Sequence, residues 1–174
     1  MPEIPTHGPE WIDDAEYHRI QTLIPIVCID VLPVRMAGTQ VAEVGLIFRP
    51  TPQGQRWCTV GGRLRHGETF AEAIRRELLG ALGPDIRFDL PADPRPQYVQ
   101  PYYTVPQATG GYDSRKHSIG LSWAVPITGT VRPDGEALHF EWFAPGQLPG
   151  PDKFGFQQDR LIAPLLAALE HGRS

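Results

Sequence analysis

Residues 61–83 read GGRLRHGETFAEAIRRELLGALG, and this stretch decides the fold. Thr69 and Glu72 have the spacing of a capping box, in which each side chain accepts a hydrogen bond from a backbone amide left open at the start of a helix. Gly83 is expected to end the helix in a left-handed cap, and Pro84 cannot continue it. The apolar residues between these ends recur at helical spacing and predict an amphipathic helix: Phe70, Ala73, Ile74, Leu78 and Leu82.

The acidic face of this helix is incomplete. Positions 77, 80 and 81 share one face, because residues three and four apart are neighbours on a helix. Carboxylates at all three would converge on a cation, but the chain has Glu77, Gly80 and Ala81 there. Magnesium usually takes only one or two protein carboxylates and completes its shell with water and phosphate oxygens. Glu77 is therefore a candidate ligand of a weakly held ion, or an acid that pairs with a neighbouring arginine on a solvated face.

The stretch resembles the Nudix box of the diphosphate hydrolases. That pattern is Gly, five residues, Glu, seven residues, Arg-Glu-apolar, one residue, Glu-Glu, one residue, Gly. The paired glutamates are replaced here by Gly80 and Ala81. The positions in register are Gly62, Glu68, Arg76, Glu77, Leu78 and Gly83.

The resemblance implies an α/β fold, the Nudix-type α/β/α sandwich with a mixed sheet, here with an extra N-terminal helix. We expect residues 1–24 to form a tail and this accessory helix, and residues 25–174 to form a single Nudix-like domain. Pro50 to Gln55 is expected to be a loop, and Gly61-Gly62 a turn. The other expected elements are helices over 11–23 and 156–170, the latter kinked or broken at Pro164, and strands over 26–34, 41–49, 56–60, 86–90, 98–105, 117–127 and 138–143.

In the Nudix family the box binds magnesium or manganese, and the metal activates water to attack a diphosphate joined to another group. Carried across, the Gly61 carbonyl and Glu77 would be metal ligands. Glu68 and Arg76 would form the ion pair that anchors loop to helix, and with Glu77 they make up the expected catalytic set. Some members take another ligand six residues ahead of a Trp, which here is Glu136. That residue is equally readable as an exposed loop acid after a Pro-Asp-Gly turn.

Arginines provide a separate indication of an anionic ligand. A guanidinium binds phosphate oxygens through two parallel hydrogen bonds. Arg63, and one of Arg49 or Arg115, are the expected substrate-binding residues. The GGR start also resembles that of the GDP-mannose mannosyl hydrolases, a Nudix branch in which an arginine at the place of Arg63 contacts the diphosphate. That branch retains the last glutamate of the box, where this chain has Ala81.

Composition limits the classes of partner. A formal net charge of -4 over 174 residues argues against a general nucleic-acid binder. No apolar stretch approaches the roughly 20 residues that span a membrane, and the chain does not start like a secretory signal peptide. We expect a cytoplasmic protein whose partner is a small phosphorylated molecule, with no membrane partner, and a homodimer is consistent with the family.

Three hypotheses about function remain open. The first is a metal-dependent Nudix-type hydrolase of a nucleoside diphosphate derivative, such as a nucleotide sugar, with a weakened magnesium or manganese site. The second, suggested by Gly80 and Ala81, is an inactive Nudix-fold protein that binds a phosphorylated ligand or a protein partner. The third is an enzyme of altered chemistry in the same pocket. Specificity is expected to lie in the loops over 50–56, 91–97 and 106–117.

Overall fold

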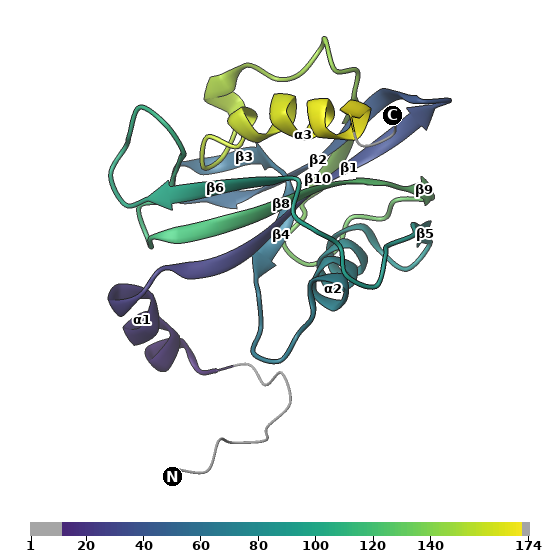
Figure 1. Ribbon diagram of the computed structural model, residues 1–174. Helices are drawn as coiled ribbons and strands as arrows, with labels where there is room; N and C mark the ends of the chain where they lie inside the picture. Colours follow the sequence, from purple (N-terminus) through teal and green to yellow (C-terminus); the bar gives the residue numbers. More distant parts are fainter. Residues whose placement is uncertain (1–11, 172–174) are drawn as a thin grey trace.

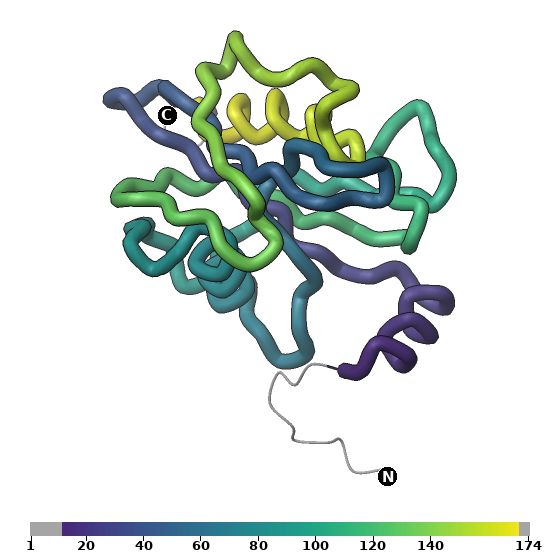
Figure 2. Tube along the Cα trace, turned by 180° about the vertical axis from the view of Figure 1, so that it is seen from behind, coloured from purple at the N-terminus to yellow at the C-terminus, as the bar shows by residue number. Residues whose placement is uncertain are grey.

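The computed structural model describes residues 12–171 of the chain. Helix α2 (Phe70–Leu82) lies on one face of a curled mixed sheet and α3 (Asp159–His171) on the other, as Figure 1 shows. The expected α/β/α sandwich is therefore confirmed. The accessory helix α1 (Asp14–Leu23) lies outside the sandwich, at its lower end in Figures 1 and 2, and none of its residues is buried.

The strands form one sheet of eight and a separate pair. In the pair, β5 (Ile86–Arg87) is antiparallel to β9 (Thr128–Gly129). A short 3-10 helix, η1 (Pro151–Lys153), precedes α3. The large sheet contains β1 (Ile26–Ala37), β2 (Gln40–Thr51), β3 (Gly54–Cys58), β4 (Val60–Arg63), β6 (Tyr98–Tyr103), β7 (Gly111–Tyr112), β8 (Ser118–Pro126) and β10 (His139–Phe143), with the order β10-β2-β1-β8-β6-β7.

Strand β1 is where the sheet divides. Residues 28–31 of β1 pair antiparallel with β4, whereas residues 34–37 pair antiparallel with β2. The other edge of β1 runs parallel to β8 over residues 26–34. The second half of β2 pairs instead with β3 and β10. Consequently β4 and the second half of β2 separate from each other, and side chains from both can line a space between them.

Alternation along β1 distributes its side chains between two cores. Ile29 and Val31 pack with Ile74 and Leu78 of α2 in one apolar cluster. Leu32 packs with the apolar residues of α3 in the other cluster. Fully burying each such side chain stabilises the fold by roughly 1.5–3 kcal/mol. This alternation puts residue 30 on the face opposite to α2.

The box helix forms as the sequence predicts, but its flanks differ. The capping box of Thr69 and Glu72 is present. Gly83 has a positive φ of 87° but a ψ of 170°, so the expected left-handed cap is wrong. Gly61 and Gly62 do not form a turn, because they lie inside β4 and pair with β1. The segment predicted as a loop over 50–55 is a tight hairpin between β2 and β3.

Other differences lie at the ends of elements. Helix α1 begins at Asp14, capped by Asp13, and the expected start at Trp11 lies outside the described residues. Helix α3 starts at Asp159 rather than 156, and Pro164 lies within it without ending it. Strands β7 and β9 have no counterpart among the predicted elements. Within residues 12–171, no helix is long and apolar enough to cross a membrane.

Candidate active site

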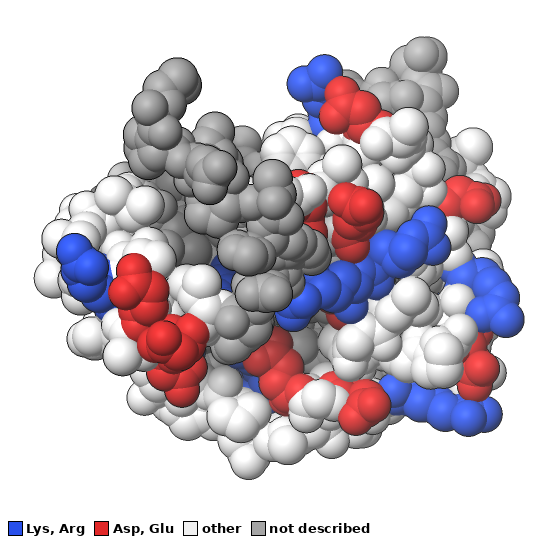
Figure 3. Space-filling view, turned by 90° about the horizontal axis from the view of Figure 1, so that it is seen from below, with Lys and Arg blue, Asp and Glu red and all other residues white. Residues whose placement is uncertain are grey.

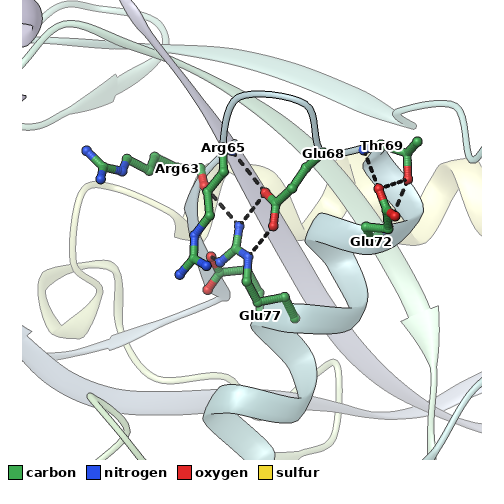
Figure 4. Close-up of polar contacts among 7 residues, drawn as sticks. Arg63, Arg65, Glu68, Thr69, Glu72 and Glu77 are labelled. Atoms are coloured by element: carbon green, nitrogen blue, oxygen red, sulfur yellow. Dashed lines mark hydrogen bonds and ion pairs between the residues drawn. The ribbon is translucent and has the colours of Figure 1, made fainter. Parts of the chain in front are cut away.

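The ion pair expected between Glu68 and Arg76 is present and fastens the loop after β4 to α2 (Figure 4). Arg76 donates from Nε to Glu68 Oε1 at 2.5 Å and from Nη2 to Oε2 at 2.8 Å. The same Nη2 donates to the carbonyl of Arg63 at 3.1 Å, and Glu68 also accepts from the amide of Arg65 at 2.9 Å. The hydrogen bonds from Arg76 lower the pKa of Glu68 and those from Glu68 raise the pKa of Arg76. The loop after β4 is thus held to α2 by two hydrogen bonds between the charged groups of Arg76 and Glu68.

Glu77 faces the backbone of β4. A Cβ placed on Gly62 would come within 2.5 Å of Glu77 Oε1, so a side chain at position 62 would require the Glu77 carboxylate to move. Glu77 also pairs with Arg76, and its side chain is 15% exposed. It is therefore a largely buried carboxylate that pairs with an arginine, and its role as a metal ligand stays a prediction. It lies against the strand from which the Gly61 carbonyl was expected to bind metal.

No carboxylate replaces the missing glutamate pair on α2. Gly80 is exposed, and a Cβ placed there would meet nothing within 4 Å. Ala81 is 7% exposed and belongs to the apolar cluster under α2. The two positions therefore differ: position 80 is open to solvent, whereas the methyl group at position 81 is part of the core.

A cavity of about 170 Å³ lies where β4 and β2 separate. Of the expected site residues, Gly61, Arg49, Arg115 and Glu136 line it. Glu68, Arg76 and Glu77 do not line it, although Gly62, which faces Glu77, does. Arg63 does not line it either, although it was expected above the same phosphates as Gly62. The complete lining is Cys28, Asp30, Arg49, Gly61, Gly62, Tyr102, Asp113, Arg115, Lys116, Ser118, Glu136, Phe156 and Gln158.

The charged side chains of this cavity are mostly paired with one another. Arg49 Nη2 lies 2.5 Å from Glu136 Oε2. Arg115 makes two parallel bonds of 2.9 Å to Asp113, which raise the pKa of Arg115. Burial raises the pKa of Glu136, Arg49 opposes this shift, and Glu77 adds to it. Figure 3 shows a band of Lys and Arg side chains with acidic side chains beside it.

Arg63 points to a different part of the surface. Gly62 faces Glu77, and the next residue of a strand points to the opposite face. The Arg63 guanidinium lies 4.1 Å from the centre of the Tyr17 ring, and Figure 4 shows it directed away from Glu77. There it lines a second, more apolar hollow between α1 and the loop after β4. The structure therefore separates Arg63 from the cavity that contains Arg49 and Arg115.

Asp30 was missed by the sequence reasoning. It lies in β1, 7% exposed, on the face opposite to α2, and lines the cavity. Tyr102 donates to its Oδ2 at 3.0 Å and Gln158 to its Oδ1 at 3.0 Å. Burial raises the pKa of Asp30 to about 6, against the hydrogen bond from Tyr102. The sequence did contain a signal for this residue, because Asp30 is an acid inside the β-branched run over 26–34. Burying an unpaired carboxylate in such a strand costs free energy, so an acid there points to a special role.

The segment before α3 closes the cavity. Phe156 and Gln157 have φ of 57° and 58°, a region that costs non-glycine residues roughly 1–3 kcal/mol each. The conformation brings Phe156 and Gln158 into the lining, and Gln158 Oε1 accepts from the amide of Thr59 at 3.0 Å. Cys28 also lines the cavity, but burial raises its pKa to about 11, so its thiol is not a nucleophile near neutral pH.

The donor set fits a divalent ion that arrives with its diphosphate better than one held by the protein alone. Among the described residues, no group of three or more His, Cys, Asp or Glu side chains is placed to hold a metal ion. Glu77 does raise the pKa of Glu136, so these two carboxylates lie within electrostatic reach of each other. Two carboxylates are within the usual range for magnesium, provided that phosphates and water supply the other ligands.

Comparisons with known proteins agree with this architecture. A protein from Jonesia denitrificans, described as a possible asymmetric diadenosine tetraphosphate hydrolase, is 32% identical, with 84% of this chain and 96% of that chain covered and a TM-score of 0.77. The NUDIX domain of NrtR from Shewanella oneidensis, solved with ADP-ribose, is 16% identical, with coverage of 91% and 99% and a TM-score of 0.61. No curated protein matches the sequence.

A third structure is an adenylyltransferase and ADP-ribose pyrophosphatase from Francisella tularensis, solved with AMP and a manganese ion. It is 18% identical, with coverage of 89% of this chain and 46% of that chain and a TM-score of 0.58. Residues 7–166 match the family described as a domain of unknown function (DUF4916). The chain therefore belongs to the DUF4916 family, and its fold is that of the Nudix hydrolases.

Proposed function

We propose that this protein is a Nudix-type hydrolase of a diphosphate joined to another group, such as a nucleoside diphosphate derivative. The observation that carries the proposal is the cavity, in which Arg49 of β2 and the adjacent Arg115 and Lys116 of the loop before β8 line one space beside the Nudix box. Guanidinium and ammonium groups that converge in this way suit adjacent phosphates. The carboxylates on the same rim are already paired with arginines, and phosphate oxygens can take their place as partners.

Glu77, Glu136 and the Gly61 carbonyl are the groups that would hold a magnesium or manganese ion. When bound, the ion polarises the phosphate and lowers the pKa of a water molecule. The protein's own contribution is positional. Arg76 orients Glu77 while it fastens the loop to α2 through Glu68, and Arg49 holds Glu136 at the cavity rim. Two parallel hydrogen bonds to Asp113 fix the orientation of Arg115, and its remaining donors are directed to the ligand.

The relatives support a nucleotide as the ligand class. The Jonesia protein's description names diadenosine tetraphosphate, and the structures from Shewanella and Francisella contain ADP-ribose and AMP. All three are nucleotides, and two of them carry a diphosphate or longer phosphate chain. A first panel of candidate substrates is therefore ADP-ribose, a nucleotide sugar and diadenosine tetraphosphate.

The test is hydrolysis of this panel with magnesium, with manganese and with EDTA. We expect turnover of at least one compound with a metal ion and none with EDTA. Glu77→Gln should reduce kcat by about a hundred-fold or more, since it removes a charge from the groups that would hold the ion. Glu72→Gln is the matched control, because glutamine also serves in a capping box and Glu72 bonds to Thr69 at the helix start, whereas Glu77 faces Gly62 of β4.

A second function is favoured by positions 80 and 81. With solvent at Gly80 and core packing at Ala81, the box lacks two of the carboxylates that Nudix hydrolases use. The alternative is a protein that binds the same nucleotides without cleaving them. Calorimetric binding of ADP-ribose without turnover under any metal condition would favour this alternative and contradict the hydrolase. Absence of both binding and turnover across the panel would contradict both functions.

A further inference from the structure

We propose that Asp30 recognises the group joined to the diphosphate, by accepting hydrogen bonds from two neighbouring donors of that group. This inference rests on the proposed phosphate-binding role of the cavity. It assigns the specificity of the site to a residue outside the Nudix box. It also gives the ligand a chemical requirement, namely a pair of O–H or N–H donors close to the diphosphate.

The hydrogen bonds of Asp30 leave part of its accepting capacity free. An ionised carboxylate can accept about four hydrogen bonds, two on each oxygen. Tyr102 takes one position on Oδ2 and Gln158 takes one position on Oδ1. One position therefore remains on each oxygen of a carboxyl group that lines the cavity. Two adjacent donors on a ligand match this arrangement.

The surroundings of Asp30 are built closely around the carboxylate. A Cβ placed on Gly120 would come within 2.3 Å of Asp30 Oδ2, so the neighbouring strand leaves room for the acid. On the other side, Gln158 is fixed by the Thr59 amide and follows the two residues with positive φ. Tyr102 is 4% exposed and Gln158 is 5% exposed. Buried donors and a strained segment thus hold one acid in a defined orientation.

The electrostatics of the cavity argue against a role for Asp30 in phosphate binding. Glu136 and Asp113 each pair with an arginine, whereas within residues 12–171 no cation forms an ion pair with Asp30. A buried, unpaired carboxylate repels an anionic ligand and costs stability. Such a group is useful in an anion site when the ligand also brings hydrogen-bond donors. Asp30 therefore suits the part of the ligand that is not phosphate.

Two chemical sources supply paired donors in nucleotides. One is the vicinal hydroxyl pair of a ribose or another sugar. The other is the amide N–H and amino group of guanine. Both present two donors to one carboxylate, so the test must distinguish them. The hydroxyl pair is absent from 2′,3′-dideoxy-ADP, and GDP carries the guanine edge that ADP lacks.

The experiment measures calorimetric affinities of inorganic pyrophosphate, ADP, 2′,3′-dideoxy-ADP and GDP for the wild type and for Asp30→Asn at pH 8. At this pH a carboxyl group with a pKa of about 6 is ionised. Asparagine has the same shape, accepts from Gln158 and donates to the Tyr102 oxygen, but loses half of the acceptors. Asp85→Asn is the control, because it removes an equal charge from an acid that pairs with Arg132 and does not line the cavity.

We expect Asp30→Asn to weaken the donor-bearing nucleotide by about ten-fold or more, and to leave pyrophosphate equal or tighter. Loss for ADP but not for dideoxy-ADP identifies the sugar hydroxyls, and loss confined to GDP identifies the guanine edge. General electrostatics predicts the opposite sign, since removing a negative charge should strengthen the binding of every anion.

An unchanged or increased affinity for all three nucleotides in Asp30→Asn would overturn the inference and leave the proposed function intact. If wild type binds neither pyrophosphate nor any nucleotide, the proposed function fails and the inference fails with it. Tyr102→Phe provides a second variant should Asp30→Asn not fold. This variant removes one donor to the Asp30 carboxylate without changing the charge. We expect the ratio of ADP or GDP affinity to pyrophosphate affinity to change. A constant ratio would contradict the inference.

Discussion

Lys116 donates a hydrogen bond of 3.0 Å from its ammonium group to the hydroxyl of Tyr17, 99 residues earlier in the chain. Lys116 lines the cavity, and Tyr17 belongs to α1, which has no buried residue. The other side chain at the same ring is Arg63, at 4.1 Å from its centre. The accessory helix therefore contacts the site through Tyr17, whose hydroxyl accepts a hydrogen bond from a cation of the cavity rim.

Removing the Tyr17 hydroxyl should weaken diphosphate binding. Tyr17→Phe keeps the ring beside Arg63 but releases Lys116, so we expect the Kd for pyrophosphate to rise by about two- to five-fold, as for a partly exposed hydrogen bond to a charged group. In a Lys116→Ala background the same change should have no further effect. Additive effects in this double-mutant cycle would show that Tyr17 does not act through Lys116.

The stability of the protein should depend on pH through Asp30. Burial raises its pKa from an ordinary 3.8 to about 6, so folding favours the protonated form. Its favourable contribution is complete below pH 3.8 and is lost as the pH rises through 6. Relative to wild type, Asp30→Asn should therefore gain stability between pH 4 and 7, by up to about 3 kcal/mol. Urea unfolding across this range measures the difference, and a constant difference would rule out the shifted pKa.

The two missing acids of the box should respond differently when restored. Gly80→Glu places a side chain in open solvent, and its gain in helix propensity is offset by the position near the helix C-terminus, so stability should stay within about 0.5 kcal/mol. Ala81→Glu puts a carboxylate into the apolar cluster and should cost at least about 2 kcal/mol. Urea midpoints of the two single variants decide this, and equal midpoints would mean that position 81 can open to solvent.

The Glu68–Arg76 contact should require a guanidinium. Arg76→Lys keeps the charge but cannot reproduce bonds to both oxygens of Glu68 and to the Arg63 carbonyl, so a loss of about 1–3 kcal/mol is expected. Arg75→Lys is the matched control, because Arg75 lies 5.2 Å from the Phe88 ring and lysine can keep a similar contact. Thermal unfolding compares the two variants. Equal shifts in Tm would argue against a specific role for the paired hydrogen bonds from Arg76 to Glu68.

What could be predicted from the sequence is mainly what depends on local spacing. The capping box and apolar period of α2 are set within a few turns of chain, and the register of the box put Glu68 beside Arg76. The orientation of Arg63 depends on whether Gly62 lies in a turn or in a strand. Pairing with β1 decides that, and β1 is about thirty residues away in the sequence. A local pattern does not encode such long-range pairing.

Asp30 shows the same limit for the site. The sequence contains an acid in an apolar run, but its partners Tyr102 and Gln158 come from β6 and from the segment before α3. No spacing relates the three positions. The positive φ of Phe156 and Gln157 is equally invisible, because neither residue type favours that region. The cavity is therefore a product of topology, whereas the box helix is a product of local sequence.

The hydrogen bond between Asp30 and Gln158 spans 128 residues. During synthesis on the ribosome, β1 emerges early. Gln158, which donates a hydrogen bond to Oδ1 of Asp30, emerges only after β10. Until then only Tyr102 of the two donors is available to the Asp30 carboxylate, so burying it leaves Oδ1 without its partner and is unfavourable. A segment that is synthesised after β10 therefore completes the polar contacts of the central strand, which favours cooperative folding of these elements over folding strand by strand.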